Sequence, residues 1–139
     1  MKFLLLIYTD DTLLEALPAG AFDQMMHGCI THADELKAQG TTPDMVQIGN
    51  EINHGICWPV GHISDADGLA ELLKAGTDAV LAVDPSVVMV MHIALGGQND
   101  ESVDFINKML ARGVYFDVIG ESWYPKWHGT PDNLRDNLD

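Results

Sequence analysis

Hydrophobic residues in this chain fall into short unbroken runs that alternate with stretches of helical spacing. The unbroken runs cover residues 3–8, 45–49, 87–93 and 114–120. Each run predicts a β-strand, and the third is nearly all β-branched or Met. Strands without polar alternation are buried on both faces, which is typical of a parallel sheet flanked by helices.

Apolar residues recur at helical spacing between the predicted strands, within residues 22–36, 69–80 and 103–110. Asp65 and Asp100 can cap the second and third of these helices, while Gly40 and Gly113 can end the first and third. Residues 131–138 begin with a proline and could form the first turns of a last helix. The pattern therefore predicts four successive βα units with no linker between them.

Four βα units are compatible with two architectures. One is an open doubly wound sheet, but no Gly-x-Gly-x-x-Gly or P-loop sequence follows any predicted strand, so nucleotide binding has no support. The other is half of a (β/α)8 barrel. Polar or aromatic residues lie at or just past the end of every predicted strand: Asp10, Asn50, Glu51, His92, Glu121 and Trp123. Because barrel enzymes build their sites at that end of the strands, we expect an α/β fold in which residues 1–139 form a single (βα)4 half-barrel domain.

The composition narrows the classes of function. Apolar residues make up 47% of the 139 residues and charged residues 20%, as in a globular protein. The formal net charge of −14 argues against nucleic-acid binding, which needs a basic surface, and against an anionic membrane. No run of about 18 apolar residues could span a bilayer. We therefore expect neither nucleic acid nor membrane among the partners.

The first apolar run superficially resembles a secretory signal. It is short, and Thr9-Asp10-Asp11 stands where a small-residue cleavage site would be needed, so it predicts a strand. Cys29 and Cys57 are too few for a disulfide framework. The histidines show no zinc-binding spacing, and we expect no metal and no cofactor.

The second predicted strand stops at Asn50-Glu51, an amide beside a carboxylic acid. At the carboxyl end of a parallel strand, this pair suits an enzyme that cleaves glycosidic bonds, in which an acid protonates the leaving oxygen. Such an acid must be protonated near neutral pH, and we expect partial burial to favour that state. A glycosidase also needs a second carboxylate.

Taken in order, the segments around these residues resemble glycoside hydrolase family 53, the arabinogalactan endo-β-1,4-galactanases. The matching segments are residues 36–53, 55–59, 91–97, 116–120 and 122–130, and the first contains Met-Val-Gln-Ile-Gly-Asn-Glu at 45–51. The segments cover most of the chain, so the resemblance is more specific than a lone Asn-Glu pair.

The resemblance implies a (β/α)8 barrel that cleaves β-1,4-galactan or arabinogalactan with retention of configuration. The four predicted strands would correspond to the third to sixth of the family. Glu51 would be the general acid/base, Asn50 would bond the sugar 2-hydroxyl, and His92 would support the substrate or the acid. Galactose rings would stack on aromatic residues: Trp58, Trp123, Tyr124 and Trp127. The family is commonly secreted, while the compartment of this chain stays open.

The family's nucleophile comes from the seventh strand, which by this resemblance the chain lacks. Glu121 stands on another strand, where family members usually carry an apolar residue, and a solvent-facing carboxylate is its simpler interpretation. An isolated half barrel would expose two sheet edges. A twofold homodimer would close eight strands into a barrel and bring Asp10 or Asp11 of one copy toward Glu51 of the other.

Two other interpretations stay open. One is a non-catalytic barrel fragment or scaffold that at most binds galactan weakly. The other is an unrelated αβ enzyme that uses Glu51 and Glu121 as an acid–base pair, which the ordered resemblance disfavours.

Overall fold

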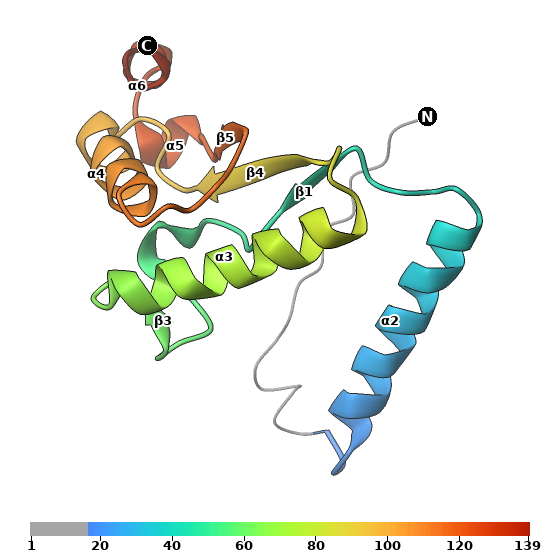
Figure 1. Cartoon of the computed structure of the whole chain (residues 1–139). Helices are drawn as coiled ribbons and strands as arrows, with labels where there is room; N and C mark the ends of the chain where they lie inside the picture. Colours follow the sequence, from blue (N-terminus) through green and yellow to red (C-terminus); the bar gives the residue numbers. More distant parts are fainter. Residues whose placement is uncertain (1–16) are drawn as a thin grey trace. The chain divides into compact units, whose positions relative to one another are not determined.

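The computed structural model describes residues 17–139. The chain divides into two compact units, residues 1–42 and 43–139 (Figure 1). The strand predicted at residues 3–8 lies outside the described residues, as do Asp10 and Asp11. The expectation that residues 1–139 form one domain stays a prediction.

The first unit contains one described helix, α2 (Ala21–Ala38). Asp23 lies in its first turn and Lys37 in its last, so each charge complements the helix dipole. Gly40 follows with φ of +73°, and its backbone N–H donates to the Lys37 carbonyl at 3.0 Å. The helix predicted to end at Gly40 is therefore confirmed.

The second unit is built around three parallel strands. They are β1 (Met45–Gln47), β4 (Val88–Ile93) and β5 (Val118–Glu121), in the spatial order β1-β4-β5 (Figure 1). Val46 pairs with Met89, and Met91 pairs with Ile119. Each step from one strand to the next crosses over through a helical segment, which is the βαβ arrangement that the hydrophobic pattern predicts.

Four helices follow these strands along the chain. They are α3 (Ala66–Val83), α4 (Asn99–Leu110), α5 (Pro125–His128) and α6 (Pro131–Leu138). Asp65 caps α3 as predicted, because its side chain accepts a hydrogen bond from the Gly68 N–H at 3.0 Å. Thr130 and Asn133 form a reciprocal capping box at the start of α6.

Two details of the sequence-based prediction are wrong. The N-cap of α4 is Gln98, and Asp100 lies inside the first turn, where its charge favours the positive end of the helix dipole. The strand predicted over residues 114–120 is shorter, since the Val114 N–H bonds to the Met109 carbonyl and completes the end of α4.

A short antiparallel ribbon between β1 and α3 was not predicted. It follows the single-turn 3-10 helix η1 (Ile52–His54) and pairs β2 (Gly55–Ile56) with β3 (Gly61–His62). Pairs of two residues carry no hydrophobic periodicity, so the sequence pattern could not indicate them.

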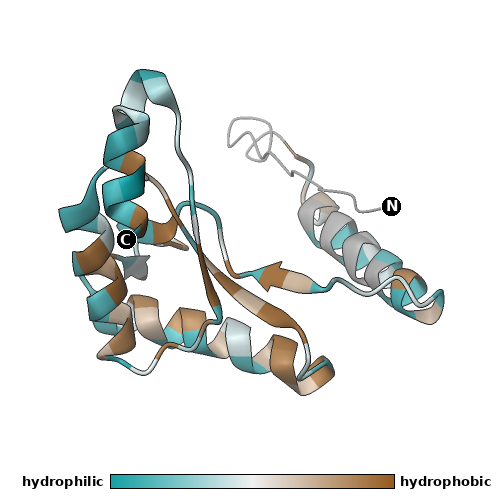
Figure 2. Ribbon diagram, turned by 90° about the horizontal axis from the view of Figure 1, so that it is seen from above, coloured by the Kyte–Doolittle hydropathy of each residue, from teal (hydrophilic) through white to brown (hydrophobic). Residues whose placement is uncertain are grey.

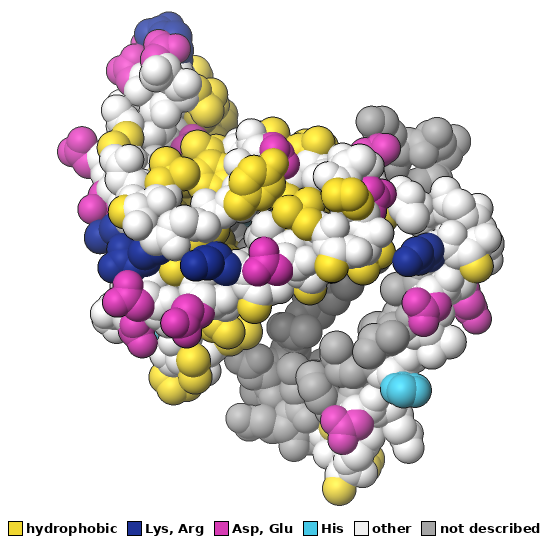
Figure 3. Space-filling model, in the orientation of Figure 1, with side chains coloured by type: hydrophobic (Ala, Val, Ile, Leu, Met, Phe, Trp, Pro, Cys, Tyr) yellow, Lys and Arg dark blue, Asp and Glu magenta, His cyan; other side chains and the backbone are white. Residues whose placement is uncertain are grey.

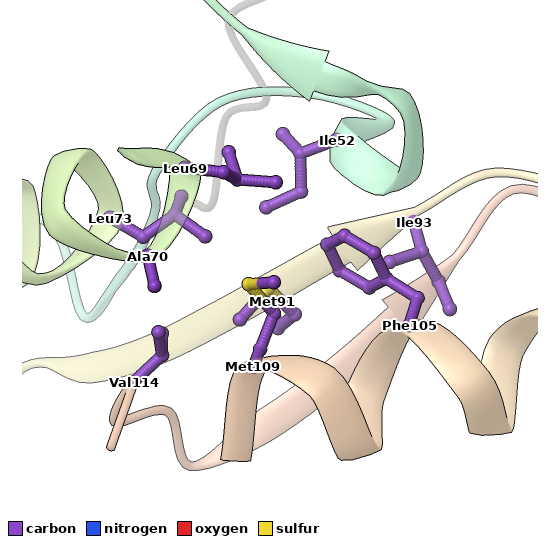
Figure 4. Close-up of a cluster of buried hydrophobic side chains, with 9 residues drawn as sticks. All are labelled: Ile52, Leu69, Ala70, Leu73, Met91, Ile93, Phe105, Met109 and Val114. Atoms are coloured by element: carbon purple, nitrogen blue, oxygen red, sulfur yellow. The ribbon is translucent and has the colours of Figure 1, made fainter. Parts of the chain in front are cut away.

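One face of the sheet is packed against the helices, and the buried side chains of several elements meet there (Figure 4). The cluster comprises Ile52, Leu69, Ala70, Leu73, Met91, Ile93, Phe105, Met109 and Val114. In Figure 2, β4 is hydrophobic along most of its length, whereas α3 and α4 alternate hydrophobic and hydrophilic residues. This is the pattern of helices that bury one side against a sheet.

The opposite face of the sheet is less covered by the residues that the structure describes. Val88, Val90 and His92 alternate with the buried residues of β4 and are half-buried. Met45 and Val118 lie on the same face by register and are 52% and 40% exposed. Figure 3 shows apolar side chains at the surface in the region where Figure 1 draws β4. The predicted burial on both faces is therefore found only on the helix side of β4, and Ile119 of β5 on that side is still 44% exposed.

Candidate active site

The turn that follows β1 places the predicted acid at the surface. Gly49 and Glu51 both have left-handed backbone conformations, with φ of +80° and +50°. A Cβ at position 49 would lie 2.6 Å from the Ile52 Cγ2 atom, so a larger residue there meets both backbone strain and a clash. Glu51 is exposed, and no described residue hydrogen-bonds to its carboxylate. The expected partial burial is therefore not found among residues 17–139.

The residues after Glu51 anchor this turn to the rest of the unit. The Ile52 side chain is fully buried in the cluster of Figure 4, and Asn53 is 5% exposed. The Asn53 Oδ1 atom accepts from the Ala94 N–H at 2.9 Å, and its Nδ2 donates to Glu101 Oε1 at 2.7 Å. Asn53 therefore ties the Glu51 turn both to the end of β4 and to the first turn of α4.

Sequence reasoning did not assign a part to Asn53. Its position two residues after Glu51, within the matched segment, was the only available signal. His54 lies 3.5 Å from the same Glu101 oxygen, so one carboxylate serves two neighbours.

A second set of hydrogen bonds crosses the carboxyl ends of all three strands. The Gln47 Nε2 atom lies 3.2 Å from His92 Nδ1, and His92 Nε2 lies 3.0 Å from Ser122 Oγ. Gln47 Nε2 also lies 2.9 Å from the Gly49 carbonyl oxygen and 3.5 Å from Asn50 Oδ1. Two predicted site residues, Asn50 and His92, therefore belong to one hydrogen-bonded chain, and Gln47 and Ser122 were missed.

Glu121 faces away from this chain of hydrogen bonds. It pairs in register with Ile93, whose side chain is buried against the helices. Asn137 Nδ2 of α6 donates to Glu121 Oε2 at 2.9 Å, and Ser102 of α4 hydrogen-bonds to the same carboxyl. Burial raises the pKa of Glu121, and these two hydrogen bonds act in the opposite direction.

The four aromatic residues predicted to stack on sugars fall into two groups. Trp58, Tyr124 and Trp127 are 64%, 56% and 69% exposed. Trp123 is half-buried, and its indole Nε1 is buried without a hydrogen-bond partner among the described residues. Exposed aromatic faces near the carboxyl ends of strands are suited to stacking on a pyranose ring.

The neighbours of these rings orient two of them. Trp58 meets His62 edge-on, with ring centroids 4.5 Å apart, and Tyr124 meets the buried His128 in the same manner at 5.5 Å. The backbone N–H of Tyr124 also donates to His128 Nδ1 at 3.1 Å. Each ring is therefore in contact with a histidine while more than half of its residue stays exposed.

Within residues 17–139, no cluster of three or more His, Cys, Asp or Glu side chains could hold a metal ion. The helices in that part of the chain are also too short or too polar to cross a membrane.

Parallel strands joined by helices, with an acid, an amide and an imidazole at their carboxyl ends, are characteristic of the βα-barrel class of enzymes. The chain belongs to glycosyl hydrolase family 53, since the sequence model of that family matches residues 28–139.

Individual relatives agree with this assignment. The chain is 48% identical over 111 residues to an uncharacterized protein in the bgaB 5' region of Niallia circulans, covering 74% of this chain and 30% of that protein. It is 37% identical over 105 residues to a probable arabinogalactan endo-β-1,4-galactanase A of Aspergillus tubingensis, covering 68% and 29%. The chain thus spans about 30% of the length of these curated relatives.

Solved structures show the same likeness in three dimensions. A catalytic domain of this family from Ignisphaera aggregans superimposes with a TM-score of 0.72 at 43% identity, covering 76% of this chain and 29% of that one. A chain from a structure of two fungal β-1,4-galactanases gives a TM-score of 0.70 at 28% identity, covering 77% and 35%. The fold described above is therefore part of a family 53 barrel.

Proposed function

We propose that this chain supplies the acid/base part of a retaining endo-β-1,4-galactanase site, with β-1,4-galactan or arabinogalactan as the substrate. Glu51 is the general acid/base, and the observation that carries this assignment is its position in the turn after β1, beside Asn50, in a chain of glycosyl hydrolase family 53. Relatives with galactanase names support the substrate class.

The other site residues take parts that match their surroundings. Asn50 hydrogen-bonds the sugar 2-hydroxyl next to the cleaved linkage, and His92 supports the substrate or the acid. Trp58, Tyr124 and Trp127 carry the stacked galactose rings, since they are the exposed members of the predicted set. Trp123 lies at the same end of the sheet and contributes an apolar wall.

Release of reducing ends from β-1,4-galactan tests the acid/base assignment. Glu51→Gln keeps the shape of the side chain but cannot deliver a proton, so we expect at least a hundredfold loss of turnover. Glu71→Gln is the matched control, because Glu71 is an exposed carboxylate on α3. Equal turnover in the wild type and Glu51→Gln would contradict the assignment.

A retaining enzyme also needs a nucleophilic carboxylate about 5–5.5 Å from the acid. Glu121 is poorly suited, because it faces the helices and is held by Asn137 and Ser102. We assign the role to Asp10 or Asp11 of a second copy in a twofold homodimer. The partly uncovered face of the sheet supports this assembly, since a second copy could cover the exposed Met45 and Val118.

Mixing two inactive variants tests the dimer. Chains with Glu51→Gln and chains with both Asp10→Asn and Asp11→Asn each lack one carboxylate. Random mixing should restore roughly a quarter of wild-type activity, because half of the dimers are mixed and each of these has one intact site of two. Sedimentation as a monomer at micromolar concentration would exclude the arrangement.

In one alternative, the chain is a member of the family that has no catalytic activity and serves as a scaffold that binds galactan weakly. The exposed Trp58, Tyr124 and Trp127 would suffice for such binding. Saturable binding of galactan oligosaccharides without release of reducing ends would favour it.

A further inference from the structure

Gln47 occupies the centre of the hydrogen-bonded chain at the carboxyl ends of the strands. It is the last residue of β1, and its register partner is Val90 of β4. Paired residues of parallel strands point to the same face, so Gln47 lies on the face that carries His92 two residues further along β4. The Gln47 side chain is exposed and does not belong to the buried cluster.

The partners of Gln47 determine which end of its amide faces them. The Gly49 carbonyl oxygen at 2.9 Å and Asn50 Oδ1 at 3.5 Å can only accept hydrogen bonds. An amide oxygen turned toward them would be repelled by both, so the donating NH2 group must face this cluster.

The same NH2 group determines the protonation of the neighbouring imidazole. His92 Nδ1 lies 3.2 Å from Gln47 Nε2, which has no lone pair to offer, so Nδ1 must be the acceptor. A neutral imidazole with a free Nδ1 carries its proton on Nε2, and that proton then points at Ser122 Oγ, 3.0 Å away. Gln47 therefore selects one of the two His92 tautomers, and the Ser122 hydroxyl can accept the Nε2 proton of that tautomer.

The contact with Asn50 has a matching consequence. Because Asn50 Oδ1 accepts from Gln47, the Nδ2 group of Asn50, which bonds to no described residue, is left to donate outward. A donor in that place can bond a sugar hydroxyl oxygen.

We propose that Gln47 is a positioning residue that holds His92 in its Nε2-protonated tautomer and turns the NH2 group of Asn50 toward the substrate. The part concerning sugar contact rests on the galactanase function proposed above, whereas the tautomer of His92 does not.

Nitrogen-15 NMR of the imidazole ring measures the tautomer directly in the full chain, without substrate. The His92 signals are assigned by their loss in His92→Gln. We expect protonated Nε2 and unprotonated Nδ1 in the wild type. In Gln47→Glu the carboxylate accepts instead of donating, so Nδ1 should become protonated, and in Gln47→Leu the two tautomers should mix.

Gln24→Glu on α2 is the matched control, because it makes the same change of charge at another exposed glutamine. It should leave the His92 signals unchanged. Backbone amide spectra check that each variant is folded. An identical His92 tautomer in the wild type, Gln47→Glu and Gln47→Leu would overturn the proposal.

A kinetic measurement examines the effect on Asn50 and His92 together. Misplaced site groups can reduce turnover by up to about a hundredfold, so Gln47→Leu should lower kcat on galactan about ten- to hundredfold while KM changes less than about threefold. Unchanged kcat together with an altered tautomer would overturn the catalytic relevance of Gln47. If the wild type itself does not hydrolyse galactan, the galactanase function is refuted. The NMR measurement still tests the tautomer of His92 in that case.

Discussion

Alternate residues of β4 meet different surroundings on the two faces of the sheet. Met89, Met91 and Ile93 are 1–3% exposed on the helix side, whereas Val88, Val90 and His92 are half-buried on the other. The helix side holds the buried cluster, and the opposite side, at its carboxyl end, holds the hydrogen-bonded chain from Gln47 to Ser122. One strand thus contributes to the buried cluster from one face and to the proposed site from the other.

This separation explains how the site tolerates polar, exposed residues. Gln47 and Glu51 can be exposed because their turn is anchored from the helix side, by Ile52 in the cluster and Asn53 in its two hydrogen bonds. The difference between the faces also predicts which substitutions affect folding and which affect function.

Neighbouring residues of β4 provide the strongest contrast. Met91→Ala removes a side chain from the centre of the cluster and should lower the free energy of unfolding by about 2–5 kcal/mol. Val90→Ala removes two half-buried methyl groups and should cost about 1 kcal/mol. Urea unfolding followed by tryptophan fluorescence measures both. Equal losses of unfolding free energy would mean that the face of the sheet opposite the helices, the open face, is covered in solution. A urea midpoint that depends on protein concentration would show that a second copy covers it.

The two amides near Glu51 form the next contrast. Asn53→Ala leaves the part-buried Ala94 N–H without its acceptor, takes one of two neighbours from the Glu101 carboxylate, and should cost about 1–3 kcal/mol. Gln47→Ala, on the open face, should change stability by less than about 0.5 kcal/mol. The same urea titration applies to this pair, and a larger loss for Gln47→Ala would break the contrast.

A smaller effect concerns Asp117, just before β5. Hydrogen bonds from the Tyr115 hydroxyl and the Met89 N–H lower the pKa of Asp117. A carboxyl with a lowered pKa in the folded state adds stability above its unfolded pKa and loses it as the pH falls through the folded pKa. Melting temperatures between pH 7 and pH 2 should therefore fall less steeply in Asp117→Asn than in the wild type.

Tyr115→Phe is the companion variant, because it removes the hydroxyl that is the main cause of the lowered pKa. Its acid-induced loss of stability should be smaller than in the wild type, because the folded-state pKa of Asp117 then lies closer to the unfolded value. Parallel pH profiles for all three proteins would contradict the assignment.

The smallest expected effect concerns Glu121, a carboxyl on the helix side. Burial raises the pKa of Glu121 in the folded state above its value in the unfolded state. The carboxyl therefore ionises more readily in the unfolded chain, and folding loses stability as the pH rises from the unfolded to the folded pKa. Glu121→Gln removes this penalty and should raise stability at neutral pH by less than about 1 kcal/mol, because the group is only half-buried. Thermal unfolding at pH 4 and pH 7 measures it. Loss of galactan turnover with no loss of stability would instead give Glu121 a catalytic part.

Much of the architecture could be predicted from the hydrophobic pattern. The helices α2, α3, α4 and α6 and the three parallel strands lie where the pattern indicates, and Asp65 caps α3 as expected. These features depend on local spacing and on capping chemistry, both of which are visible within a few residues of sequence.

Other features depend on contacts between distant residues. The alternation of one strand cannot tell which face meets helices, so the orientation of Glu121 toward Asn137 was not predictable. The hydrogen bonds of Asn53 and Gln47 join residues 41 to 48 positions apart and leave no local signature.

By itself, the sequence determined the order of the βα units, the position of Asn50-Glu51 at a strand end and the resemblance to glycoside hydrolase family 53. These properties follow from residue types and their local spacing. Only the tertiary structure decided that Gln47, His92 and Ser122 meet, that Glu121 faces the helices, and that the Glu51 turn is anchored by Asn53. The physical reason is register: the pairing of parallel strands decides which side chains share a face, and no single strand contains that information.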